Sequence, residues 1–117
     1  MEEVARCTIE LQKAIQNSSA YEDYRKALEL LKENPELKHK VDEFRGKNYQ
    51  LQNSADDLDY FEEIEKLERE YREIRKHPLA SSYLDKELTL CRMVQRVEEK
   101  LVGMIDLDIE AFENLIF

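Results

Sequence analysis

Few residue patterns in this chain could support chemistry, and the clearest is a carboxylate followed three residues later by a histidine, Glu36 and His39. On a helix this spacing puts both side chains on one face, as in the iron sites of di-iron helical bundles. Such sites also need a second pair of the same kind and two further inward carboxylates. The only other histidine, His77, has the apolar Ile74 three residues before it. Glu36 and His39 are therefore interpreted as a first-turn acid and a surface imidazole.

Nucleophilic catalysis and cofactor binding have less support still. The sequence contains no glycine-rich elbow and no phosphate-binding loop. The two cysteines, Cys7 and Cys91, are far apart, and neither has a second cysteine at metal-binding or redox spacing. We expect both to be reduced thiols buried in the core, as free cysteines usually are. The sequence predicts a protein that is not an enzyme and that holds no metal or cofactor.

Composition predicts an all-α protein that does not bind polyanions. The 117 residues include only two Gly and two Pro, and about half are Ala, Glu, Lys, Leu or Arg, a share typical of long helices. The formal net charge of −9 disfavours direct binding to nucleic acid, because phosphate groups are repelled. Without a long apolar run, a basic amphipathic face or a signal peptide, no membrane insertion is expected. We expect a cytoplasmic protein with a single helical domain over residues 1–117.

Apolar spacing and capping residues divide the chain into about five helices. The first carries a stripe at spacings of four, three and four, and it ends at Asn17 and Ser18. A capping box formed by Ser19 and Glu22 predicts the start of the second helix. Asn34 followed by Pro35 predicts the boundary between the second and third helices. The stripe of the first helix consists of Val4, Thr8, Leu11 and Ile15, with Cys7 and Ala14 beside it.

Two heptad patterns that are out of phase predict a long antiparallel helical hairpin. The first comprises Leu37, Phe44, Leu51 and Leu58 with Val41, Asn48 and Ala55, and the second Tyr60, Leu67 and Ile74 with Ile64 and Tyr71. They are displaced by two residues, which on one continuous helix rotates the face by about 200°. The expected helices run to about Gln52 and from about Leu58 to Lys76, and a single bent helix is the alternative. Asn48 either fixes the register of the seam or is exposed near the hairpin end.

The last predicted helix opens at His77 and Pro78 and has an apolar face wider than the usual stripe of about 100°. A face this wide needs cover on two sides, from the hairpin and from the first helix or a second subunit. The candidate interface residues are Leu84, Leu88, Val94, Val97, Leu101, Met104, Ile109 and Phe112. Acidic and apolar residues alternate over 107–117, a segment expected to dock against the first helix or across a dimer.

Several segments occur in a characteristic order: Ser19-Ala20-Tyr21-Glu22-Asp23-Tyr24-Arg25-Lys26-Ala27-Leu28, Pro35-Glu36-Leu37, Val41-Asp42-Glu43-Phe44-Arg45 and the helices over 61–76 and 79–105. This order resembles that of the YlbF/YmcA family, small helical proteins of Gram-positive bacteria. The similarity covers roughly residues 4–109. The resemblance implies an all-helical hairpin domain that dimerises or pairs with a paralogue and acts by binding other proteins. Members are linked to competence, sporulation and biofilm control. Some form a complex with a third protein that influences a phosphorelay and messenger RNA maturation by RNase Y.

One departure from the family bears on cofactors. Members that form the complex carry a cysteine-bearing C-terminal region associated with iron–sulfur ligation, and Cys7 and Cys91 match no such cluster. Cofactor binding is therefore not carried over, and a branch similar to YheA fits at least as well. The hypothesis is a non-catalytic regulatory protein, a homodimer or paralogue heterodimer, that modulates a regulatory or RNA-processing assembly. The alternative is a metal- or small-ligand-binding bundle with Glu36, His39 and buried carboxylates at its site.

Overall fold

The computed structural model describes residues 1–52 and 60–105, and every regular element in these ranges is an α-helix. The all-α fold class predicted from composition is thus confirmed. Residues 107–117, expected to dock, lie outside the described residues. None of the described helices combines the length and apolarity required to cross a membrane. The five helices are α1 (Glu2–Gln16), α2 (Ser19–Lys32), α3 (Pro35–Gln52), α4 (Tyr60–Arg75) and α5 (Pro78–Gly103).

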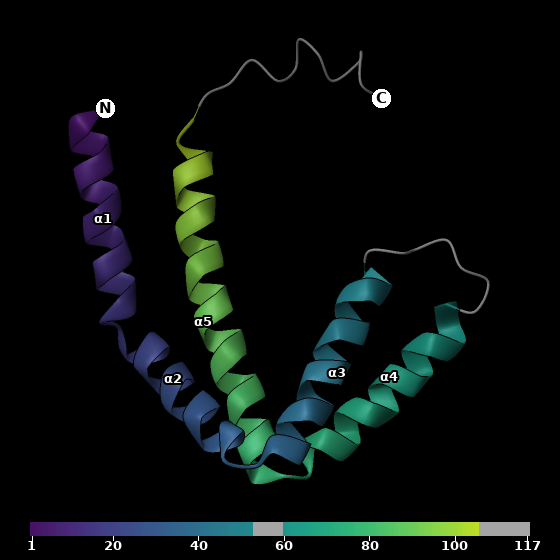
Figure 1. The fold of residues 1–117 in the computed structure, drawn as a ribbon. Coiled ribbons are helices and arrows are strands. Elements are labelled where there is room, and N and C mark those ends of the chain that lie inside the picture. Colours follow the sequence, from purple (N-terminus) through teal and green to yellow (C-terminus); the bar gives the residue numbers. More distant parts are fainter. Residues whose placement is uncertain (53–59, 106–117) are drawn as a thin grey trace, which may run out of the picture.

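The helices form two arms that diverge from a common junction (Figure 1). One arm contains α2 packed along α5, with α1 continuing beyond the end of α2, and the other is the α3/α4 hairpin. The extents are 47 × 42 × 16 Å. Because an α-helix with its side chains is about 10–12 Å across, the shortest extent leaves little room for a second layer. Much of the helix surface therefore has no neighbour among the described residues.

The hydrophobic core lies at the junction of the two arms. Its members come from the C-terminal halves of α2 and α4 and from the N-terminal parts of α3 and α5. Tyr24, Leu28 and Leu67 are among the partly buried side chains around it. Neither α1 nor the C-terminal half of α5 supplies a buried residue. The buried residues are Ala27, Leu31, Val41, Phe44, Ile74, Ala80, Tyr83 and Leu84.

The helix boundaries follow the capping residues, with one correction. Asn34 accepts a hydrogen bond from the amide of Leu37 at 3.2 Å, as predicted. The second helix, however, is capped by Ser18, whose hydroxyl accepts from the amide of Tyr21 at 3.3 Å. The predicted capping box with Ser19 is therefore wrong by one residue. The α1–α2 connection needs only Asn17 and an extended Ser18, so Ser19 is already helical.

The predicted antiparallel hairpin is confirmed, and the single bent helix is wrong. Helix α3 ends at Gln52 as expected, α4 begins two residues later than expected, and the two helices pack on each other. Phe44 and Ile74 are buried, and the ring of Phe44 lies 5.4 Å from that of Tyr71. Asn48 is half-buried on the seam.

The cysteines are a second correction. Both Cys7 and Cys91 are exposed, so the prediction of two buried core thiols is wrong for the protomer. Cys7 lies on α1, which has no buried residue along its fully described length. Cys91 lies in the half of α5 that contributes nothing to the core. The reason is geometric, because an apolar position is buried only where a second helix covers it.

Candidate functional site

The candidate interface residues of α5 range from buried to exposed. Leu84 belongs to the core, and Val94 and Val97 are half-buried. Leu88, Leu101 and Met104 are exposed. Two further candidates, Ile109 and Phe112, lie outside the described residues.

The exposed part of this face is broader than the sequence alone suggested. Leu101 is 50% exposed, and the next residue, Val102, is 69% exposed. Consecutive residues of a helix point about 100° apart, so these two apolar side chains lie on different sides of α5. Ile105, which follows the helix, is also exposed. The C-terminal end of α5 thus presents apolar side chains that no described residue covers.

Helix α1 carries a second uncovered apolar face in the same arm. Val4 is 62% exposed, Leu11 is exposed, and Ile15 is half-buried. Between the described residues of α1 and α5, no two Cα atoms approach within 8 Å. Helices that pack directly have axes about 8–10 Å apart. Some of their Cα atoms then lie closer to each other than about 8 Å. In the protomer α1 therefore does not cover α5.

A polar cluster at the junction joins three helices. The hydroxyl of Tyr83 donates a hydrogen bond to Glu87 at 3.0 Å, and the guanidinium of Arg45 lies 2.8 Å from the same carboxylate. Arg45 also lies over the ring of Tyr83, 5.7 Å from its centroid, and the ring of Tyr24 is 5.6 Å from that of Tyr83. Burial raises the pKa of Tyr83, and a hydrogen bond with Tyr24 and the charge of Glu87 raise it further. The cluster holds α2, α3 and α5 together.

No residue pattern in the sequence predicted this cluster. Arg45 and Glu87 lie in different predicted helices, and no motif links them. The only signal was the spacing of Tyr83 and Glu87, four residues apart on one predicted helix and so on the same face. The contact with Arg45 depends on how the two arms cross, which local spacing does not specify.

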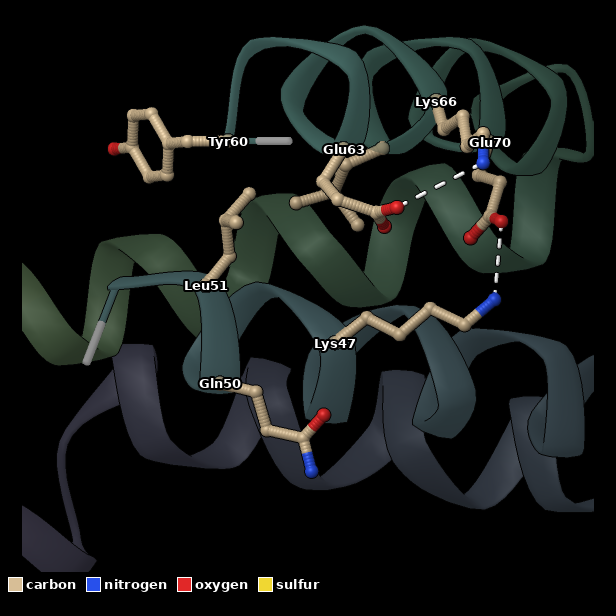
Figure 2. Close-up of a pocket in the computed structure, with 8 residues that line it drawn as sticks. Lys47, Gln50, Leu51, Tyr60, Glu63, Lys66 and Glu70 are labelled. Atoms are coloured by element: carbon tan, nitrogen blue, oxygen red, sulfur yellow. Dashed lines mark hydrogen bonds and ion pairs between the residues drawn. The ribbon is translucent and has the colours of Figure 1, made fainter. Parts of the chain in front are cut away.

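A groove of about 420 Å³ runs along the outer seam of the hairpin (Figure 2). Lys47 donates a hydrogen bond to Glu70 at 3.0 Å across the seam, and this bond raises the pKa of the lysine. Lys66 lies 3.7 Å from Glu63. The contact between Lys47 and Glu70 joins α3 to α4. Because each lysine already faces a carboxylate, the groove is not a site for a free anion. The lining residues are Lys47, Gln50, Leu51, Tyr60, Glu63, Lys66, Leu67 and Glu70.

The structure does not assemble a site around Glu36 and His39. Both side chains are exposed, and the Nε2 atom of His39 lies 2.9 Å from the carboxylate of Glu43, one turn further along α3. Over residues 1–52 and 60–105, no three His, Cys, Asp or Glu side chains are grouped so as to hold a metal ion. In place of a metal site, the described residues present exposed apolar surface on α1 and α5.

Comparison with known proteins identifies the family. The model of the family described as control of competence regulator ComK, YlbF/YmcA, matches residues 6–106. The chain belongs to the YlbF/YmcA family. The matched range runs from α1 to the end of α5 and thus includes both uncovered faces of this YlbF/YmcA protein. The family's link to ComK supports a regulatory role. Searches of curated proteins and of solved structures found no significant match.

Proposed function

We propose that this YlbF/YmcA protein is a non-catalytic regulatory protein that acts through protein–protein contacts and self-associates through α1 and α5. The observation that carries the proposal is the exposed apolar surface at the C-terminal end of α5, formed by Leu101, Val102 and Met104. A contiguous apolar surface of this kind on a protein typically marks an interaction site. Covering one large apolar side chain contributes on the order of 1.5 kcal/mol or more, so several together favour association.

The proposed partners are a second copy of the chain or a paralogue, and through them other regulatory proteins of the cytoplasm. Together they modulate an assembly that controls competence, sporulation or biofilm formation, or one that processes RNA. Family membership supports the regulatory part of this proposal. The charge of −9 supports action through proteins over direct contact with RNA or DNA.

Light scattering at micromolar concentration tests self-association. We expect the mass of two chains, and the mass of one chain across that range would contradict the proposal. The regulatory part is tested by deleting the gene and measuring ComK activity with a reporter. Complementation by the wild-type chain but not by a correctly folded Leu101→Glu chain is expected, and complementation by both would show that this face is not required.

A further inference from the structure

We propose that one side of the α3/α4 hairpin binds a basic amphipathic helix of a partner protein. The apolar floor of a groove between the two helices holds the partner's apolar stripe, and Glu65 and Glu68 at its rim attract the partner's basic side chains. The inference rests on the proposed action through protein contacts. It adds a surface separate from α1 and α5, and it states the chemistry of the partner.

The groove opens on the other side of the hairpin seam from Lys47 and Glu70. The residues that follow these two in the chain, Asn48 and Tyr71, point about 100° further round their helices. Leu51 lines both grooves. We call the second one, which has a volume of about 270 Å³, the aromatic groove. Its lining includes Phe44, Asn48, Leu51, Ile64, Glu68 and Tyr71.

The apolar side chains of the aromatic groove are only partly covered. Phe44 is buried beneath it, with its ring 5.4 Å from that of Tyr71, but Tyr71 is itself exposed and Ile64 is half-buried. Phe61 lies on the same face of α4 as Ile64, three residues before it, and is 79% exposed. The ends of α3 and α4 near this residue point away from the junction of the arms (Figure 1). Large apolar side chains grouped at a surface typically mark an interaction site.

A helix is the element that this groove accepts. The walls of the groove are the helices α3 and α4, whose backbone N–H and C=O groups bond within each helix, so they offer no edge to which a strand could be added. A partner helix brings a backbone that is already paired, and it inserts apolar side chains spaced at i, i+3, i+4 and i+7. Its apolar stripe would cover Phe61, Ile64 and Tyr71.

The loop end of the hairpin is acidic, which determines the charge of the partner. Residues 44–68 contain seven acidic and three basic side chains, a formal charge of −4. All three basic side chains already face a carboxylate. Arg45 lies 2.8 Å from Glu87, Lys47 lies 3.0 Å from Glu70, and Lys66 lies 3.7 Å from Glu63. This end of the molecule therefore attracts Lys and Arg side chains.

Two carboxylates are placed to meet those side chains. Glu68 lines the aromatic groove, and Glu65 lies three residues before it and so beside it on α4. Both are exposed. Neither forms an ion pair with any residue of 1–52 or 60–105, and this includes Arg69 and Arg72, which follow them by one turn. Each can pair with a base of the bound helix without first losing a partner among these residues.

The same charge argues against occupants from this chain. Residues 106–117 contain four acidic and no basic residues, so the acidic rim repels them. A two-fold contact between the grooves of two copies uses the same surface twice, which would set Glu65 and Glu68 against the same residues of the other copy. Like charges that face each other across an interface disfavour it. A basic helix of a different protein meets neither cost.

Two synthetic peptides test the proposal against the full chain. One is an amphipathic helix made of Leu and Lys, with Leu at i, i+3, i+4 and i+7, and the other has Glu in place of every Lys. Fluorescence anisotropy at about 0.15 M salt, where long-range attraction is screened, gives the Kd of each. We expect the basic peptide to bind at least about tenfold more tightly than the acidic one, because its charges complement the rim.

A charge variant and its matched control locate the polar contact. Glu65→Gln combined with Glu68→Gln should weaken binding of the basic peptide about fivefold, because two partly exposed ion pairs are lost. Glu98→Gln combined with Glu99→Gln changes the net charge by the same amount at exposed positions of α5. This control should leave the Kd within about twofold of the wild-type value.

An apolar variant and its control locate the other half of the contact. Phe61→Ala should weaken binding at least about fivefold, because the peptide no longer covers the ring. Val102→Ala removes an exposed apolar side chain of α5 and should leave the Kd unchanged. Phe61 and Val102 are 79% and 69% exposed, so neither change disturbs the core.

Each of the following results overturns the inference. Neither peptide binds, or both bind equally well. The Glu98 and Glu99 control weakens binding as much as the Glu65 and Glu68 variant, which would indicate attraction to net charge alone. Val102→Ala weakens binding and Phe61→Ala does not, which would place the peptide on α5.

Light scattering separates this inference from the proposed self-association. If wild type is a dimer and Phe61→Ala is a monomer, a second copy occupies the aromatic groove and the inference is wrong. If wild type is a dimer that binds neither peptide, the inference fails while self-association stands. If wild type is a monomer that binds the basic peptide with the expected variant effects, self-association fails while the groove stands.

Discussion

The guanidinium of Arg45 on α3 lies 2.8 Å from the carboxylate of Glu87 on α5, forming an ion pair between the two arms of the molecule. Both side chains are partly exposed, at 43% and 24%. A second pair, Arg75 with Asp85 at 2.7 Å, joins the end of α4 to α5. The buried core lies around the same junction, so these contacts bear on how the arms are held together.

The coupling between Arg45 and Glu87 should be measurable but small. A double-mutant cycle with Arg45→Gln and Glu87→Gln should give about 0.5–1 kcal/mol, because water screens partly exposed pairs. Urea unfolding provides the free energies. The Arg6–Glu10 pair on α1 is the matched control, with an expected coupling of about 0.3–0.5 kcal/mol for an exposed i,i+4 pair. A coupling at Arg45 no larger than zero would mean that the contact does not stabilise the junction.

Tyr83→Phe should lower the free energy of unfolding by about 1–2 kcal/mol at neutral pH, because it removes the hydrogen bond donated to Glu87. The effect should also depend on pH. Since the folded protein raises the pKa of Tyr83, chiefly by burial, its contribution is complete below the unfolded pKa of about 10 and is lost as the pH rises above it. Urea unfolding between about pH 8 and pH 11 should therefore show a shallower decline for Tyr83→Phe than for wild type. Parallel curves would contradict the proposed cause.

Leu101→Glu should convert the dimer to a monomer without unfolding it. Leu101 is 50% exposed in the protomer, so the new carboxylate stays solvated in the monomer but would be buried and unpaired in a dimer. Light scattering and circular dichroism report the two properties separately. Thr89→Glu, at an exposed position on the polar side of α5, is the control and should remain dimeric. Loss of helicity in Leu101→Glu would instead assign this residue to the core.

Val94→Glu should be more damaging than Leu101→Glu. Val94 is already half-buried in the protomer, so a carboxylate there loses water even without a partner. We expect a lower melting temperature as well as loss of the dimer, and differential scanning calorimetry checks it. Equal melting temperatures for the two variants would contradict the deeper burial of Val94 relative to Leu101.

Both thiols should react without denaturant. Cys7 and Cys91 are exposed in the protomer, so Ellman's reagent should label both in dilute solution, where association is weakest. If the chain self-associates through α1 and α5 as proposed, the labelling rate should fall as the protein concentration rises. If the thiols react only after unfolding at every dilution, the cysteines are buried in the core of the protomer.

Sequence alone determined the helices and most of their limits. The out-of-phase heptads of Leu37 and Tyr60 specified a hairpin, because a two-residue displacement turns an apolar stripe to the opposite side of a helix. Asn34 marked a helix start through the hydrogen bond that its side chain accepts. These features depend on neighbours within a few residues. The family could likewise be recognised from residue order, and the match over residues 6–106 confirmed it.

Tertiary structure decided which apolar positions are covered. Leu84 and Leu101 belong to the same wide face of α5, yet Leu84 is buried and Leu101 is half exposed. Cys7 has the spacing of a core residue and is exposed, because α1 changes direction at Asn17 and Ser18 and does not pack on α5. Helical spacing specifies which side chains share a face. Whether that face meets another helix depends on the direction of elements distant in the chain, which no local pattern contains.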